Sequence, residues 1–582
     1  MKRLQSIDIG WGLVILLSLF AVAPLTAPGF FLKAHDATIG AYFLVQFDKG
    51  IADGALYPRW AMDWTFGYGY PLFVVIAPLA FYVAEAFHLL GAGIADALKI
   101  TYALAFVLSG LSMYLLGRAL FGRAGGIVAA VLYVYAPYHL VDIYVRADLA
   151  EFASFAFFPA ILWAIRRLSR AQSRAEVLHC VAVGALLYGG LILTHITMAL
   201  IFTPVAVFYT VMQVGSRKQT VESEAGSGAP WRLLLFSAVC LLLGIAVSAA
   251  YLFPGFLEQR YLKAQDLIGG YYGYANHYVY PFQFLSPFWG YGYAAIGPDD
   301  QMPYQLGALA VVLALGSLWA LRHMSADVRR HAVFFLSVTA LAIFAMLSIS
   351  RPLWDIFRPL VAFIQFPWRL LTLTSLSLAL VGGAVGSAVN PHPVQTVARQ
   401  AAPLLVLLAL LASYSYVVPQ YTDGDVSLTK MIQFQLDTKE LLGDTIWVTE
   451  KPAGSPMVAE YLAGRLPTRA VADDQRAQIE VLHDGGASYE VEVTVRQPTD
   501  VLFRIRYFPG WRAYLDGKAV ETTIRPPQGL MAVSVPAGEH RVLLRFEDTP
   551  LRRGSKIISL LGVVIVAGLL VWARMERRRS NS

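Results

Sequence analysis

Long apolar runs separated by short polar connections dominate this chain. Each run approaches the roughly 20 residues that a helix needs to cross a lipid bilayer. The pattern predicts an α-helical polytopic membrane protein with about 12 to 13 transmembrane helices. The twelve clearest runs lie near residues 11–28, 98–117, 125–142, 152–168, 177–194, 197–214, 232–254, 304–321, 332–349, 369–389, 401–418 and 556–573.

The apolar segment 71–91 is a further candidate for a transmembrane helix. It carries Pro71, Pro78, Glu85 and His88, which are unusual in a helix that faces lipid. If this segment does not cross alone, the positive-inside rule places both chain termini and all basic connections in the cytoplasm. We therefore interpret 71–91 as a juxtamembrane or re-entrant helix, or as half of a pair whose partner is not apparent. The basic connections are 118–123, 166–174, 217–218, 322–330, 392–399 and 574–579.

The pattern changes after residue 418, where apolar runs stop until residue 557. Apolar and polar positions alternate in the second half of this stretch, which predicts an antiparallel β-sandwich. By the topology above, this domain lies outside the cytoplasm. The predicted organisation is a transmembrane domain at 1–418 with outer loops 29–97 and 255–302, a mainly β domain at 419–555, and a final helix with a basic cytoplasmic tail at 556–582. The predicted strands are 489–495, 501–507, 511–515 and 542–546.

Composition agrees with the membrane class. Apolar residues make up 57% of the chain, charged residues 15%, and the mean hydropathy is +0.55, which excludes a water-soluble protein of 582 residues. The formal net charge of +7 comes mainly from the basic connections. The bilayer is therefore the expected partner, and nucleic acid is not.

Unusual polar residues gather on the predicted outer face. His35 and Asp36 follow the first apolar run, and Asp36 is the candidate catalytic residue. The candidate substrate-binding residues are His35, Arg146, Asp148, Glu151, His195 and Arg369. Further polar and aromatic residues of the first outer loop belong to the same predicted surface, namely Gln46, Asp48, Asp53, Arg59, Trp60 and Asp63.

Each of these residues also has a structural explanation. Asp36 can simply face water, Arg369 can extend to lipid phosphates, and His195 can bond a neighbouring helix. Arg146, Asp148 and Glu151 can form an ion-pair network. The aromatic loop 255–302 suits a sugar ring and a membrane interface equally well. The location of all of them on one face favours the functional interpretation.

Three short motifs and the overall pattern resemble known membrane proteins. An acidic residue after the first helix, many helices and a C-terminal outer domain resemble GT-C membrane glycosyltransferases. Three motifs resemble bacterial membrane proteins described as 6-pyruvoyl-tetrahydropterin synthase-related: Tyr-Val-Arg-Ala-Asp-Leu-Ala-Glu-Phe at 144–152, Leu-Thr-His at 193–195 and Gln-Phe-Pro-Trp-Arg at 365–369. Residues 507–518 and 536–541 resemble the C-terminal domain of YfhO-type proteins.

The resemblance implies a plasma-membrane glycosyltransferase of a bacterium or archaeon with an extracytoplasmic active face. It would move a hexosyl or pentosyl group from a polyprenyl-phosphate donor to an extracytoplasmic glycan, lipid or protein. Asp36 would act as general base, Arg146 and Arg369 would stabilise the leaving phosphate, and the transfer would be inverting. His35 stands where many relatives carry a second acid, so the need for a divalent metal ion at Asp36 stays open, and no other cofactor is indicated.

Two other function classes stay open. A polytopic protein can flip or export a lipid-linked glycan without forming a bond, although the charged residues gather at one face and not at the midplane. A noncatalytic scaffold for envelope assembly is the third class. The β domain carries four aromatic residues with two possible roles: they guide the acceptor as exposed side chains, or they pack inside the protein. These residues are Tyr507, Phe508, Trp511 and Tyr514. Oligomeric state has no signature in the sequence.

Overall fold

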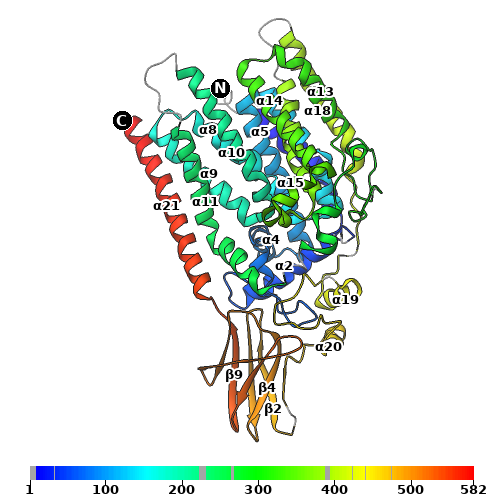
Figure 1. Ribbon diagram of the computed structural model, residues 1–582, viewed down its shortest axis with the longest axis vertical. Coiled ribbons are helices and arrows are strands. Elements are labelled where there is room, and N and C mark those ends of the chain that lie inside the picture. The colour runs from blue at the N-terminus through cyan, green and yellow to red at the C-terminus, as the bar shows by residue number, and fades with distance from the viewer. Residues whose placement is uncertain are drawn as a thin grey trace.

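A bundle of apolar helices carries a β domain at one end, as Figure 1 shows for this computed structural model. The structure describes residues 8–221, 231–263, 268–299, 301–386 and 394–581, except residues 32, 423, 440, 473 and 474. Lys2, Arg3 and part of the basic connection 392–399 therefore lie outside the described residues. Both described chain ends lie at the end of the bundle opposite the β domain.

Among the described residues, nine helical spans are long and apolar enough to cross a membrane, so this is a multi-pass membrane protein. They are formed by α1 (Ile9–Val22), α5 (Ile94–Val134), α7 with α8 (Leu149–Ser154 and Phe157–Ser169), α9 (Arg174–Thr194), α10 (Ile196–Val221), α11 (Trp231–Leu257), α14 (Ala326–Met346), α17 (Leu371–Val385) and α21 (Pro550–Asn581). Two shorter apolar stretches cover two more predicted runs: Ala308–His323, which contains α13 (Ala308–Ala320), and Ala402–Tyr416, which contains the second half of α18 (Val394–Ser413).

The 41-residue α5 accounts for two of the predicted runs, because it bends back on itself at Gly122. The backbone φ of Gly122 is +75°, in the region that favours glycine. Beyond the bend the two halves pack closely: a Cβ on Gly117 would lie 3.2 Å from the Cβ of Ala129, and one on Gly110 would lie 3.1 Å from Val134. Each of the twelve predicted runs therefore lies mainly within helical residues.

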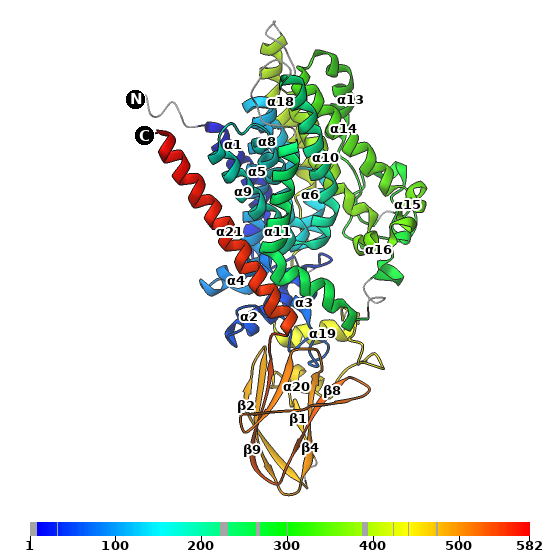
Figure 2. The ribbon, with the colours of Figure 1, turned by 60° about the vertical axis from the view of Figure 1, so that its left-hand side comes forward.

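The segment 71–91 forms two short helices, α3 (Leu72–Val75) and α4 (Leu79–Leu89). With 11 residues, α4 is about 16 Å long, roughly half the thickness of the hydrocarbon core. It packs with α2 (Ala37–Ala52) at the end of the bundle nearest the β domain (Figures 1 and 2). This geometry fits the juxtamembrane interpretation.

The β domain is a sandwich of two antiparallel sheets with strand orders β1-β4-β8-β7 and β2-β3-β9-β5-β6. Inward residues alternate along β3 and β4, and the rings of Tyr489 and Phe503 meet across the sandwich at 6.2 Å. The predicted strands correspond to β3, β4, β5 and β9. The strand bounds are β1 Ala470–Val471, β2 Ala477–Asp484, β3 Ser488–Val495, β4 Thr499–Arg506, β5 Trp511–Leu515, β6 Lys518–Val520, β7 Thr523–Arg525, β8 Leu530–Val535 and β9 Gly538–Phe546.

The two parts of the molecule meet across residues 58–74, all of which are buried; we name them the buried segment. Two helices before the sandwich, α19 (Leu428–Thr438) and α20 (Val458–Leu462), lie beside it. Gln435 of α19 accepts a hydrogen bond from the amide of Phe66 at 2.8 Å, and the amide of Arg506 in β4 donates to Tyr68 at 2.8 Å. The β domain is thus joined to the membrane domain by a packed interface as well as by the chain.

The prediction that four exposed aromatics of the β domain guide an acceptor is wrong for two of them. Phe508 is fully buried and Trp511 is 5% exposed, because both pack at the interface. The ring of Trp511 stands edge-on to Trp60 of the buried segment at 5.4 Å. Tyr507 and Tyr514 are half-buried. The alternative, that these aromatics pack inside the protein, accounts for Phe508 and Trp511.

Candidate active site

A turn between the second half of α5 and α7 positions the central charged residues. Residues Asp142–Arg146 form one π-helical turn, and Ala147 ends it with a left-handed backbone of φ 53°. Asp148 then caps α7, accepting a hydrogen bond from the amide of Glu151 at 2.9 Å. Because the turn and the start of α7 follow each other directly, the side chains of Asp142, Arg146 and Asp148 lie close together.

Ion pairs tie this turn together. The guanidinium of Arg146 lies 3.0 Å from the carboxylate of Glu151 and 3.2 Å from that of Asp148, and it also pairs with Asp142. Tyr138 donates a hydrogen bond to Glu151 at 2.6 Å. Arg146 is 2% exposed, and Glu151 and Asp142 are fully buried. Burial at this depth makes the network costly to disrupt.

Arg369 joins the network from the start of α17. Its Nε lies 3.0 Å from Glu151, and its Nη1 donates to the side chain of Gln365 at 2.8 Å. Phe366 and Trp368 stack on each other, and their rings face the guanidinium groups of Arg369 and Arg146 at 5.1 and 4.8 Å. The Gln-Phe-Pro-Trp-Arg motif therefore supplies both a positive charge and two stacked aromatic rings that face the guanidinium groups.

His35 and Asp36 join the same site through their backbone amides. The amide of Asp36 donates to the carbonyl of Arg146 at 2.7 Å, and the amide of His35 donates to Val145 at 3.1 Å. The imidazole of His35 stacks on Tyr293 at 4.5 Å, and its Nε2 lies 2.8 Å from the carbonyl of Gly292. The aromatic loop thus lies against this side of the site.

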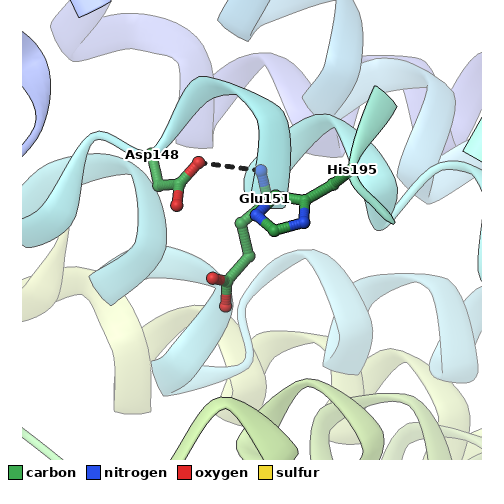
Figure 3. A group of neighbouring side chains, drawn as sticks. All are labelled: Asp148, Glu151 and His195. Atoms are coloured by element: carbon green, nitrogen blue, oxygen red, sulfur yellow. Dashed lines mark hydrogen bonds between the residues drawn. The ribbon is translucent and has the colours of Figure 1, made fainter. Parts of the chain in front are cut away.

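His195, the residue between α9 and α10, lies beside the carboxylates. Figure 3 shows its imidazole next to Asp148 and Glu151, and one possible ligand atom from each of the three residues lies within 4.8 Å of the others. Two carboxylates and an imidazole suit a divalent transition metal. Arg146 and Arg369 already hold these carboxylates, so a metal ion would share them with the two guanidinium groups.

The side chains differ in access. Arg146, Glu151 and Arg369 are buried, whereas His35, Asp36, Asp148 and His195 are partly exposed. A substrate therefore meets these four residues first. The two guanidinium groups lie behind them as a fixed source of positive charge.

Burial and neighbouring charges set the ionisation of the accessible groups. Burial, together with the nearby carboxylate of Asp148, raises the pKa of Asp36 from 3.8 to about 7, although Arg146 and Arg369 oppose the rise. Burial and Arg146 lower the pKa of His35 to about 4. Burial also acts on Asp148, but Arg146, His195 and Arg369 outweigh it and lower the pKa of that carboxyl. The pKa values of the neighbouring carboxyl groups of Asp36 and Asp148 are thus shifted in opposite directions, which is typical of acid–base sites.

All seven residues predicted for the site lie in this one region. Other residues of the predicted outer surface do not: Gln46, Asp53 and Asp63 of the first loop contact each other or the β domain. The sequence analysis missed Asp142 and Tyr138. A signal for Asp142 existed, because it stands four residues before Arg146, the spacing of a helical ion pair.

Comparisons with known proteins give solved structures only, since no family model and no curated protein matches the chain. One is the arabinofuranosyltransferase AftD from mycobacteria, at 17% identity and a TM-score of 0.43, covering 74% of this chain and 28% of that one. Another is the oligosaccharyltransferase AglB from Archaeoglobus fulgidus with an inhibitory peptide and a dolichol-phosphate, at 14% identity and a TM-score of 0.41, covering 74% and 58%.

A third similar structure is ArnT from Cupriavidus metallidurans bound to undecaprenyl phosphate, at 13% identity and a TM-score of 0.33, covering 82% of this chain and 97% of that one. This chain thus spans less than a third of the AftD chain and just over half of the AglB chain. These TM-scores are low. The function proposed below therefore rests on the residues of this chain.

Proposed function

We propose that the protein is a membrane glycosyltransferase that moves a sugar from a polyprenyl-phosphate donor to an acceptor outside the cytoplasm. The observation that carries this proposal is the position of Asp36: its amide is bonded to the carbonyl of Arg146, beside the buried guanidinium groups of Arg146 and Arg369, and its pKa is raised. A base beside fixed positive charge suits a reaction that removes a proton and releases a phosphate. The position of this acid directly after the first helix is one of the features on which the resemblance to GT-C membrane glycosyltransferases rests, and it supports the same reaction class.

In the proposed reaction, ionised Asp36 takes the proton from an acceptor hydroxyl. The oxygen then bonds to the anomeric carbon of the donor while the bond from that carbon to the phosphate oxygen breaks, so the lipid phosphate leaves with the electron pair. Arg146 and Arg369 stabilise the growing negative charge through space, because carboxylates already occupy their nitrogens. A single displacement of this kind inverts the anomeric centre.

We also propose that Asp148, Glu151 and His195 hold a divalent metal ion when donor is bound. The two guanidinium groups are engaged by carboxylates, so an incoming phosphate adds negative charge that they only partly balance. A divalent cation would act as a Lewis acid on the phosphate oxygens. His195 supplies the ligand that a purely structural ion-pair network does not need.

Incubation of the purified protein with a panel of polyprenyl-phosphate sugars and extracytoplasmic acceptors tests the reaction class. We expect sugar transfer, or slow hydrolysis when acceptor is left out. Movement of the intact lipid-linked sugar across vesicles without bond cleavage would instead establish an exporter. Tight binding of envelope glycans with neither reaction would establish a scaffold.

The pH dependence of turnover should follow Asp36. The ionised form is the base, and its pKa of about 7 means that this form accumulates only as the pH approaches neutrality. We expect turnover at saturating donor to rise through about pH 7 and to level off above it. A rate that is constant from pH 5 to pH 9 would contradict the assignment of the base.

Removal of metal should reduce turnover if the second proposal holds. We expect chelation to slow transfer and added manganese or magnesium to restore it. In His195→Ala, restoration should require a higher metal concentration, since one ligand is lost. His88→Ala is the control, because His88 lies near the end of α4, outside the site, and its imidazole bonds the carbonyl of Ala92. Full turnover in chelator would exclude the metal.

A further inference from the structure

Asp53, the residue directly after α2, binds residues at the tip of the hairpin between β2 and β3. Its carboxylate lies 2.6 Å from Nε2 of His483 and accepts hydrogen bonds from the amide of Ala487 at 2.7 Å and from the hydroxyl of Ser488 at 2.9 Å. The Asp53 side chain is only 7% exposed. One carboxylate at the end of α2 thus binds three groups of the β domain.

The hairpin also approaches α2 too closely for any side chain. A Cβ built on Gly486 would lie 2.6 Å from Cα of Gly50, and one on Gly485 would lie 2.3 Å from the carboxylate of Asp53. Lys49 adds a second link, since its ammonium lies 3.4 Å from Asp484 at the end of β2. The last turn of α2 is therefore fixed to the β domain by charge, hydrogen bonds and backbone contact.

The other end of α2 is the candidate active site. Asp36 is the residue directly before the helix, and its amide is bonded to the carbonyl of Arg146. Between the two ends α2 runs for 16 residues, about 24 Å. Phe43 and Phe47 of its middle pack on Trp64 and Phe73 of the buried segment, at 5.3 and 4.9 Å. A packed helix transmits a displacement at one end to the other, because packed interiors deform little.

From these contacts we infer that α2 is a strut by which the β domain holds Asp36 in place, with Asp53 as the positioning residue. The expected effect on turnover rests on the proposed function. The expected effect on the position of Asp36 does not, because it follows from the contacts of α2 alone. The β domain then contributes to the reaction through the placement of the base, without touching the reacting atoms.

Hydrogen exchange and kinetics of Asp53→Ala test the strut. We expect faster amide exchange in residues 33–40, where the amides of His35 and Asp36 report the contact with the turn of Arg146. In the same variant kcat should fall by about 10²-fold with little change in KM, since a misplaced base slows the reaction step more than binding. Asp53→Asn, which keeps one acceptor oxygen, should recover part of both effects.

The matched control is Asp516→Ala. Asp516 also binds a histidine, His540 at 2.8 Å, and accepts from a backbone amide, that of Arg541 at 2.8 Å, but it lies at the turn between β5 and β6. This control should leave exchange in 33–40 and kcat unchanged. If Asp53→Ala frees the hairpin at 484–488 while exchange in 33–40 stays as in the parent protein, the strut is disproved. A parent protein without transfer activity would refute the proposed function, and the exchange data would still decide the strut.

Discussion

Replacement of Asp36 by asparagine should abolish sugar transfer while the protein stays folded and inserted. Asparagine has nearly the same shape and preserves the backbone bond to Arg146, but it cannot accept a proton at neutral pH. General base catalysis contributes about 10²–10⁴-fold, so turnover should fall by that factor. Initial rates with a saturating polyprenyl-phosphate sugar measure the loss.

The variant also removes a partly exposed carboxyl group whose charged form is disfavoured by the neighbouring carboxylates of Asp148 and Glu151, so its stability should not decrease. Asp48→Asn is a suitable control, because Asp48 lies on the same helix and its side chain is 37% exposed. The control should turn over at the parental rate. If Asp36→Asn retains full turnover on an identified donor and acceptor, another group must be the base.

Replacement of Asp63 by alanine should be the most destabilising change in the first loop. Asp63 is fully buried and pairs with Arg469 at 2.5 Å and with Lys49 at 3.0 Å, while Tyr461 donates to it at 2.6 Å. Its loss leaves the buried guanidinium of Arg469 short of a partner, which costs about 3–5 kcal/mol. Denaturant unfolding of the purified protein in detergent, with protease release of the β domain as a second probe, measures the loss.

Two comparisons make this result specific. Asp500→Ala breaks an ion pair with Arg525 in which both side chains are more than 40% exposed, and it should cost at most about 1 kcal/mol. Replacing both Asp63 by Ala and Arg469 by Met should recover part of the loss, since no unpaired guanidinium is then left. A double variant that is less stable than Asp63→Ala would contradict this account of the interface.

Periodicity alone was enough to predict the architecture. Each apolar run became a helix because lipid leaves a backbone no other way to satisfy its hydrogen bonds. Helix α5 folds back on itself at Gly122, which agrees with the basic connection at 118–123. Helix α4 is short, which agrees with the prolines Pro71 and Pro78 before it. The strands β1, β2, β6, β7 and β8 were not predicted. Residues 477–481 of the edge strand β2 alternate, but the alternation breaks at Leu482, where the register shifts between Val481 and His483. Residues 530–535 are apolar on both faces.

The site was predicted less completely for a physical reason. Unusual charges at helix ends pointed to Asp36, Arg146 and Arg369, but sequence does not show which charges pair across space. Arg369 and Glu151 are 218 residues apart and 3.0 Å apart in the structure. For the same reason Asp53 and Asp63 were grouped with the active surface, whereas their partners, His483 and Arg469, lie in or beside the distant β-sandwich.

The buried segment also has a consequence for biogenesis. Asp63 and Arg469 are separated by 406 residues, so at ordinary synthesis rates about 20 to 80 s pass between them on the ribosome. During that interval Trp60, Trp64 and Asp63 lack the surface that buries them in the finished protein. A newly made chain must therefore keep this loop from aggregating until Arg469 has been synthesised. Truncated products that end before residue 469 should be strong substrates for membrane quality-control proteases.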